Sequence, residues 1–460
     1  MKYPLSTDST NMSEYSLDIP YDLLKTNNMH MNTKRKHYPT FTFGLFILTV
    51  LVSMQACKSS SSIYKAPKVA AFRAGEMPAP PGMVYVPSGT ILFKSSLDTA
   101  DTGKNVSLSA FFIDETEVTN KQYREFINWV ADSIAVTDYL NDDQYFLNTG
   151  EQGEERRIDW KKVKKASPIW KSNDPTIRER LSPMLEMRGS QRTLNPEVLR
   201  YRFSYQKTKG NIKKVYVTDT VPVMPVEEIW SSDFPNAQLA SLDVNYFTHQ
   251  SFDYYPVVGV TWRQARAFTD WRGKEIMATL MKNSYLSGYQ LTLSLPTEAQ
   301  WQYAAEGKLD PRDTSSTKRM TIDGSEGKEK LAVNFKQGDG TYSRDGATFT
   351  LPVKSYTPNA FGIYNMAGNV SEWTLDAFSP SAMVFVNDLN PALLYDADEK
   401  DADALKRKVV RGGSWKDNGE QLNTDTRNYS VDYEPHSYIG FRCVMSAFEM
   451  PTIQSKTRKF

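Results

Sequence analysis

The chain has 460 residues, enough for two or three average domains or for one large elaborated domain. Its hydrophobic content of 40%, with 12% aromatic residues, is ample for a core, and its 24% of charged residues is ordinary. The formal net charge of +1 gives no reason to expect binding to nucleic acid.

The N-terminal region has the pattern of a secretion signal. Basic residues at 34–36 precede an apolar run over 41–54, which ends shortly before Cys57. A basic segment, a short apolar segment and a small residue before the cut are typical of a secretory signal. The apolar run is shorter than the roughly 20 residues that a membrane-spanning helix needs. We therefore predict a signal peptide over 1–56.

Cys57 and the serines that follow it resemble a bacterial lipoprotein processing site, so we predict that Cys57 is lipidated; a transmembrane anchor is the alternative. Residues 1–28 precede Met29 and Met31, either of which gives a signal of normal length, and we interpret them as a mis-assigned start. Lipidation leaves Cys443 as the single thiol, which excludes an intramolecular disulfide.

The lipidated cysteine and a tether occupy 57–81, where serine, alanine and proline give the composition of a spacer. A folded domain is predicted over 82–450, followed by a tail at 451–460. It begins with a strand and a turn in the sequence MVYVPSG at 83–89.

Three helix starts share one signature, in which threonine at the N-cap precedes glutamine at the third helical position. Such a pair satisfies two backbone amides reciprocally. Aromatic and small apolar residues follow at helical spacing, and we interpret them as core. The three caps and their stripes are Thr119 with Tyr123, Phe126, Ile127 and Val130; Thr261 with Ala265, Phe268 and Trp271; and Thr297 with Trp301, Ala304 and Ala305.

A charged, turn-rich stretch over about 136–250 is too long for an ordinary loop, so it is predicted to be an insertion with its own structure. A second variable stretch covers about 380–408 and is acidic near 396–403.

Seven strings in order resemble the formylglycine-generating enzyme (sulfatase-modifying factor) family, over roughly 82–135 and 255–446. This resemblance implies an α+β fold, the family's version of the C-type-lectin-like fold, with much irregular structure and the large insertion. The strings are FID at 112–114, EVTN at 117–120, PVVGVTW at 256–262, LPTEAQW at 295–301, NMAGNVSEW at 365–373, RGGSW at 411–415 and IGFRC at 439–443.

The resemblance also implies which chemistry is missing. Catalytic members use two cysteines after the Gly-Gly-Ser string to bind copper, and soft thiolates suit that ion. Asp417 and Leu422 hold those two positions here. Cys443 is expected to be buried and inert, and Arg411 and Arg442 to pair with carboxylates or carbonyls inside the fold.

A second branch of the superfamily holds iron with three histidines. This chain has four histidines, and two of them precede the predicted cleavage site: His30, His37, His249 and His436. We therefore expect no catalytic residue and no redox or organic cofactor, and we predict that the chain is not an enzyme.

Members of the family bind structural calcium at two places, and the resemblance implies both calcium sites in this chain. Mixed carboxylate, amide and carbonyl oxygens suit this hard cation. Hydrogen bonds that tie the loops without a metal are the alternative. The first candidate set is Asn334, Phe335, Asp345 and Ala347, and the second is Asn365, Gly368, Val370 and Glu372.

Within the superfamily, residues 117–135 resemble the GldK/PorK gliding-motility and type IX secretion lipoproteins, which share the lipoprotein start, the tether and the insertion. The related GldJ lipoproteins are the nearest alternative. The resemblance implies an outer-membrane lipoprotein facing the periplasm. It implies a homo-oligomeric ring built with a GldN/PorN-like periplasmic protein.

We expect 136–250 to make the contacts with the partner or between subunits, and we expect its deletion to leave the domain folded. Two other functions stay open. One is a periplasmic lectin-like binding module with a groove for glycans or peptides. The other is an enzyme of unrecognised type that uses Asp417 and neighbouring carboxylates. A buried carboxylate of strongly raised pKa in a closed pocket would support it, and an open, solvated Asp417 would count against it.

Overall fold

The computed structural model describes residues 79–97, 103–147, 156–163, 167–209, 213–280, 291–307, 321–323, 329–340 and 342–447. The predicted signal peptide, Cys57, the tether up to residue 78 and the tail 451–460 lie outside these residues. Within the described part, no helix has the length and apolar character needed to cross a membrane.

Two four-stranded sheets carry the family strings. The first has the order β1 (Met83–Val86), β4 (Phe111–Asp114), β16 (Val444–Ser446), β9 (Leu293–Ser294), with every pair antiparallel. The second has the order β14 (Asn428–Val431), β13 (Arg407–Arg411), β12 (Ser371–Ala377), β15 (Ile439–Gly440), and only β15 runs parallel to β12. The expected strand and turn at 83–89 are confirmed by β1 and the start of β2 at Gly89.

Two long helices, α1 (Asn120–Ile134) and α6 (Trp262–Leu280), pack through the predicted aromatic stripes. The ring of Tyr123 stacks on that of Phe268 at a centroid distance of 5.5 Å, and Phe126 lies 5.2 Å from Trp271. The three threonine-glutamine caps are confirmed, with each threonine amide donating to the glutamine 2.8 or 2.9 Å away. Local sequence chemistry therefore fixes where these helices begin.

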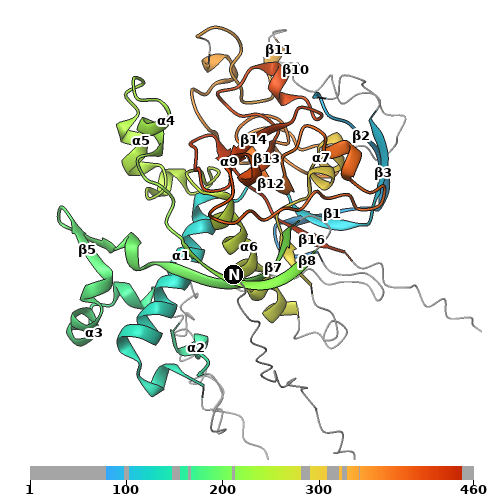
Figure 1. Ribbon diagram of the computed structural model, residues 1–460. Coiled ribbons are helices and arrows are strands. Elements are labelled where there is room, and N and C mark those ends of the chain that lie inside the picture. The colour runs from blue at the N-terminus through green and yellow to red at the C-terminus, as the bar shows by residue number, and fades with distance from the viewer. Residues whose placement is uncertain are drawn as a thin grey trace, which may run out of the picture. The chain divides into compact units, whose positions relative to one another are not determined.

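The insertion, residues 136–250, starts as the π-helical turn η1 (Ala135–Leu140) that continues α1. It contains the short helices α2 (Trp160–Val163), α3 (Pro175–Arg180), α4 (Ile229–Asp233) and α5 (Ala240–Asn245). It also contains two hairpins, β5 (Leu185–Arg188) with β6 (Gln191–Leu194), and β7 (Arg200–Lys209) with β8 (Lys213–Pro222). In Figure 1 the second hairpin forms a long curved ribbon that passes α6.

Among the described residues, the insertion has no hydrophobic core separate from the rest of the domain. Met184, Leu199 and Phe203 lie in a cluster with side chains of α1 and α6. A second cluster joins Ile229, Trp230, Leu242 and Tyr246 to Val258, Val370 and Trp415. Deleting 136–250 would therefore expose the aromatic face of α1 and α6 to water. This shared packing argues against the expectation that deletion leaves the domain folded.

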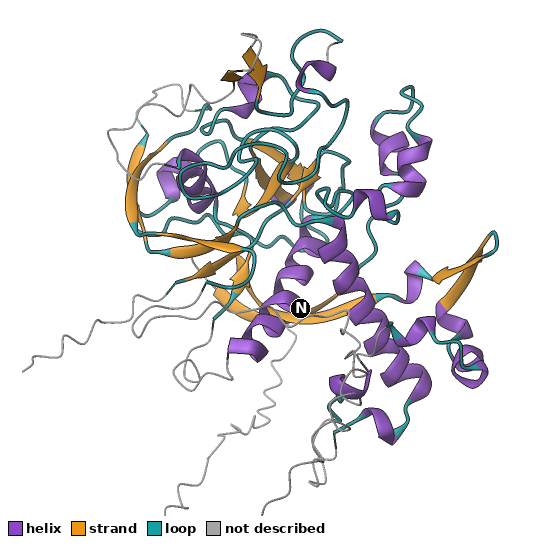
Figure 2. Ribbon diagram, turned by 180° about the vertical axis from the view of Figure 1, so that it is seen from behind, coloured by secondary structure: helices purple, strands orange, loops and turns teal. Residues whose placement is uncertain are grey.

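The remaining elements are short and connected by long irregular segments, seen as teal loops in Figure 2. They are the hairpins β2 (Gly89–Phe93) with β3 (Lys104–Leu108) and β10 (Thr321–Asp323) with β11 (Glu329–Leu331), and the helices α7 (Glu298–Glu306), α8 (Ala382–Phe385) and α9 (Asp403–Lys406). This mixture of helix, sheet and irregular chain is the α+β class expected.

Candidate functional site

Three family strings that are far apart in the sequence meet at the centre of the second sheet. Glu372 of β12 lies opposite Arg411 of β13 on one side and opposite Gly440 of β15 on the other. The string at 411–415 leaves β13 through Gly412 and Gly413, whose φ angles of 93° and 64° favour glycine. The turn that follows carries Asp417 and Leu422.

Arg442 and Glu372 form a buried ion pair at this centre. The guanidinium donates to the two carboxylate oxygens at 2.6 and 2.7 Å, and it also donates to the carbonyl of Asp114 at 3.0 Å. The indole of Trp301 donates to the same carboxylate at 2.8 Å. Both ionic side chains are at most 1% exposed. A buried charge needs such complete matching, because desolvation is costly.

A second buried cluster joins Glu298 at the start of α7 to Arg411 and Arg427. The Glu298 carboxylate accepts hydrogen bonds from Arg411 at 3.1 Å and from Arg427 at 2.6 and 2.8 Å. The expectation that Arg411 and Arg442 pair with carboxylates inside the fold is confirmed. Both arginines have structural roles.

Asp417 and Leu422, at the positions of the family's cysteine pair, are both part of the turn structure. The Asp417 carboxylate accepts from the Ser414 amide at 2.9 Å and its hydroxyl at 2.6 Å, and from Lys416 at 2.8 Å. Leu422 is buried, and a Cβ on Gly413 would come within 2.9 Å of it. These side chains hold the turn closed.

Cys443 is fully buried beside Asp114, whose carboxylate accepts its backbone amide at 2.9 Å. Burial raises the pKa of its thiol well above the usual value. Because the thiolate is the reactive form, this cysteine is unreactive, as expected.

The two histidines within the described residues, His249 and His436, have different hydrogen-bond partners. His249 caps a short 3₁₀ turn by accepting the amide of Ser251 at 3.2 Å. His436 bonds to Asp233 and Ser430. His30 and His37 lie outside the described residues. In the described ranges, no group of three or more His, Cys, Asp or Glu side chains is arranged to hold a metal ion.

The first candidate calcium set lies in one loop. The Asp345 carboxylate accepts the amides of Phe335 at 3.0 Å and Ala347 at 3.1 Å, and an amide proton of Gln337 at 2.7 Å. Asn334 donates to the Phe349 carbonyl at 2.9 Å. Burial raises the pKa of Asp345. This loop therefore gathers oxygen donors of the kind calcium takes, and calcium here stays a prediction.

The second candidate set fits calcium less well. Glu372 is already matched to the Arg442 cation. Asn365 donates to the carboxylate of Glu117 at 3.1 and 3.2 Å, which leaves its side-chain oxygen for other contacts. Gly368 packs against the Asn334 carbonyl, to which a Cβ on Gly368 would come within 2.3 Å. Together with Val370 these residues build a tight turn next to β12.

Glu117 is a buried carboxylate whose role the sequence did not indicate. It is fully buried and accepts from the Asn369 amide at 2.8 Å. Burial raises its pKa to about 7, with Arg442 acting in the opposite direction and Glu372 adding to the rise. Asp376 behaves similarly, since burial and then Glu298 raise its pKa to about 7. Both are buried in the packed interior.

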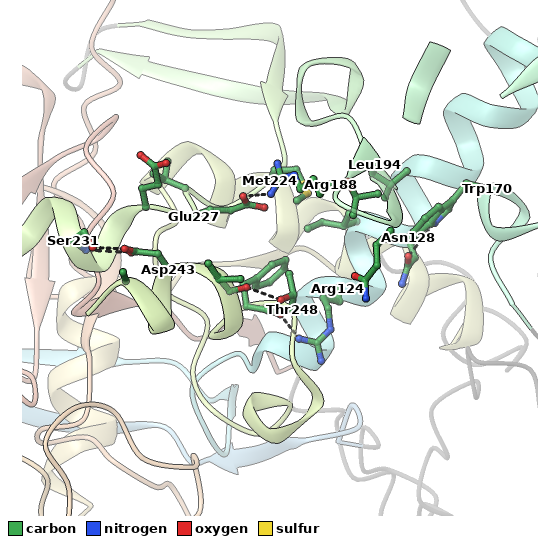
Figure 3. A pocket seen from close by; sticks show the side chains of 18 of the residues that line it. Arg124, Asn128, Trp170, Arg188, Leu194, Met224, Glu227, Ser231, Asp243 and Thr248 are labelled. Atoms are coloured by element: carbon green, nitrogen blue, oxygen red, sulfur yellow. Dashed lines mark hydrogen bonds and ion pairs between the residues drawn. The ribbon is translucent and has the colours of Figure 1, made fainter. Parts of the chain in front are cut away.

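A cavity of about 1250 Å³ lies between α1 and the insertion and not at the family strings. Figure 3 shows Arg124 and Asn128 of α1 on one wall, with Asp243 and Ser231 of the insertion joined by a hydrogen bond on another. A smaller cavity of about 370 Å³ lies at the turn itself and is lined by Asp417, Ser430 and His436 among others.

Curated relatives of this chain include formylglycine-generating enzymes. A formylglycine-generating enzyme of Streptomyces coelicolor is 31% identical over 199 residues, which are 42% of this chain and 53% of that enzyme. An inactive Cα-formylglycine-generating enzyme 2 of Bos taurus is 28% identical over 206 residues, 43% of this chain and 52% of that protein. The chain spans about half the length of these curated relatives.

Among solved structures, that of PvdO from Pseudomonas aeruginosa aligns over 83% of this chain and 99% of its own, at 17% identity and a TM-score of 0.42. The family described as sulfatase-modifying factor enzyme 1-like domain matches residues 69–447, most of the chain. This chain belongs to that sulfatase-modifying factor family.

Proposed function

We propose that this protein is a structural lipoprotein of the type IX secretion and gliding-motility machinery, without the oxidative chemistry of its family. It would be anchored in the outer membrane through Cys57 and form a periplasmic ring with a GldN/PorN-like protein. The resemblance of 117–135 to the GldK/PorK lipoproteins, together with the long insertion, supports this assignment. The C-type-lectin-like version of the fold is part of the same proposal.

One observation carries the non-oxidative half of the proposal. The positions of the family's copper-binding cysteines hold an aspartate bound to its own turn and a leucine buried at 2% exposure. Neither is a ligand for a soft metal ion. The inactive bovine relative supports the idea that this family includes members without the enzyme's activity.

The insertion supplies the surface that we assign to assembly. Met187, Tyr216 and Val244 are 65%, 78% and 71% exposed, on the β5–β6 hairpin, the β7–β8 hairpin and α5. Large apolar side chains with this exposure are candidates for the anchors of a protein interface.

Co-purification from native membranes tests the assembly role. Since deletion of the insertion would disrupt the core, we would replace Met187, Tyr216 and Val244 together by serine. The control replaces Val384, Phe385 and Leu389, which are 77%, 63% and 62% exposed outside the insertion. We expect the first variant to lose a GldN/PorN-like periplasmic partner while the control retains it. Equal retention by both variants would overturn the assignment of the insertion.

We also propose calcium at the Asn334–Ala347 loop, as a structural ion. Adding millimolar calcium to chelator-treated protein should raise the melting temperature, and Asp345→Asn should remove that rise. Glu372 is excluded as a test position because its loss also breaks the pair with Arg442. No response of the unsubstituted protein to calcium would contradict the proposal.

A further inference from the structure

Three side chains from separate segments form an Asp–His–Ser trio at the smaller cavity: Asp233, His436 and Ser430. Asp233 ends α4 of the insertion, Ser430 lies in β14, and His436 lies in the turn before β15. The imidazole Nδ1 is 3.1 Å from Asp233 Oδ1, and its Nε2 is 3.1 Å from Ser430 Oγ. These are the two contacts that a serine nucleophile, its base and an orienting acid require.

The hydrogen bonds around Asp233 decide which nitrogen of His436 carries the proton. Its other oxygen, Oδ2, accepts the amide and the hydroxyl of Ser437 at 2.6 and 2.7 Å. Burial works against ionisation, but the bonds from His436 and Ser437 together hold the pKa of Asp233 below its usual value. An ionised carboxylate can only accept, so the proton lies on Nδ1.

In the tautomer with a proton on Nδ1 alone, Nε2 is an acceptor that faces Ser430. The hydroxyl of Ser430 then donates to Nε2, which is the arrangement that activates a serine for attack. The ring itself is held in place by Tyr438, which stacks on it at a centroid distance of 4.7 Å. The ammonium group of Lys416 lies 4.1 Å from the centroid of the Tyr438 ring.

The cavity next to the trio can admit a small substrate. Its volume of about 370 Å³ lies within the range of small-molecule sites, and its wall includes Ser430, His436, Tyr438 and Lys416. Lys416 also lies on this wall, where its ammonium group pairs with Asp417 at 2.8 Å. The volume suits a short carboxylic ester and excludes a folded protein.

We propose that Ser430, His436 and Asp233 constitute an acyl-transfer site that hydrolyses short carboxylic esters. Ser430 Oγ bonds to the ester carbonyl carbon while its proton passes to His436 Nε2. The carbon–oxygen bond to the alcohol breaks, and that alcohol leaves with the proton. Water then attacks the acyl carbon and gives a proton to His436, and His436 returns that proton to Ser430 Oγ as the bond between Oγ and the acyl carbon breaks and the carboxylic acid leaves. Asp233 orients the ring and balances the charge of the imidazolium.

This activity is independent of the assembly role proposed above, and it uses β14 and the insertion instead of positions 417 and 422. It departs from the prediction that the chain is not an enzyme, which was based on the missing cysteine pair and the missing three-histidine site. Since the insertion contributes Asp233, the orienting acid exists only where the insertion is docked on the domain.

A fluorophosphonate probe, which bonds covalently to activated serines, tests the proposal on the purified full chain. Peptide mass spectrometry should find the probe on Ser430. Ser430→Ala should lose labelling and the hydrolysis of p-nitrophenyl acetate. Asp233→Asn should slow labelling by about 10²-fold or more. Ser204→Ala is the control, because Ser204 is exposed and bonded to Thr218 with no base beside it.

Melting temperatures measured in parallel separate loss of the fold from loss of activity. Labelling of Ser430 that depends on Asp233 in folded protein supports the proposal. An unlabelled Ser430 in folded wild-type protein overturns it, as does equal labelling of a folded Asp233→Asn variant. The trio is then a clamp that ties α4 to β14. Neither result alters the co-purification test.

Discussion

Around β12 and β13 the charges are buried and matched, whereas in the described part of the insertion most charged pairs lie nearer the surface and most buried side chains are apolar. The side chains of Arg442 and Glu372 are 0% and 1% exposed. Those of Arg188 and Glu227 in the insertion are 45% and 29% exposed. Removing one partner of a buried pair strongly destabilises the fold, whereas an exposed pair contributes little to its stability. The family strings therefore specify the centre, and the insertion depends on hydrophobic packing.

Removing the central arginine should have the largest effect. Arg442→Met leaves Glu372 and the neighbouring Glu117 buried without their cation, so we expect a loss of about 3–5 kcal/mol in the free energy of unfolding. Urea denaturation followed by tryptophan fluorescence measures it. The matched variant in the insertion, Arg188→Ala, should lose less than about 1 kcal/mol. Equal losses in the two variants would contradict the contrast between the regions.

A core substitution within the insertion tests whether that region is part of the same folding unit. Leu199 is fully buried in the cluster shared with α1 and α6. Leu199→Ala should lower the free energy of unfolding by about 2–5 kcal/mol in a single transition. Met187→Ala, at an exposed position nearby in sequence, should change it by less than about 0.5 kcal/mol. Two separate transitions would show that the insertion unfolds alone.

The third expected effect concerns pH and is the smallest when it is measured over a single pH unit. The pKa of Glu117 is raised from 4.5 to about 7 in the folded chain, chiefly by burial. Between those values the folded chain keeps a proton that the unfolded chain has lost, so stability falls as pH rises from about 4.5 to 7. Glu117→Gln should reduce this slope by up to about 1.4 kcal/mol per pH unit.

Asp376 provides an internal reference for that measurement. Its pKa is also raised to about 7, and its contribution to the slope stays in the Glu117→Gln variant. Denaturation at four or five pH values between 4.5 and 7.5 gives the slope of stability against pH for the unsubstituted protein and for the Glu117→Gln variant. An unchanged slope would show that Glu117 is ionised throughout this range.

Much of the centre could be predicted from the sequence because its signals are local. The three helix caps depend on residues three positions apart, and the stripe from Tyr123 to Val130 follows the helical period. The glycine turn after Arg411 is also local. The sequence predicted that Arg411 and Arg442 each pair with carboxylates or carbonyls, but it did not identify the partner residues.

The rest depends on contacts between residues distant in the chain. Arg427 and Glu298 are separated by 129 positions, and His436 and Asp233 by 203. No period or short motif in a single sequence marks such pairs. The same holds for the insertion. Apolar and polar residues alternate along the strands of its hairpins, but no local pattern in the sequence indicates that these hairpins pack against α6. Its lack of a separate core could therefore not be foreseen.

The burial of Cys443 has a consequence for how copies of this protein can be joined. Its thiol has no exposed surface and a raised pKa, so it cannot exchange with disulfides in solution. The chain contains one other cysteine, Cys57. If that residue carries lipid, no covalent link between neighbouring subunits can form through sulfur. Any assembly would then stay reversible and could exchange subunits in an oxidising compartment.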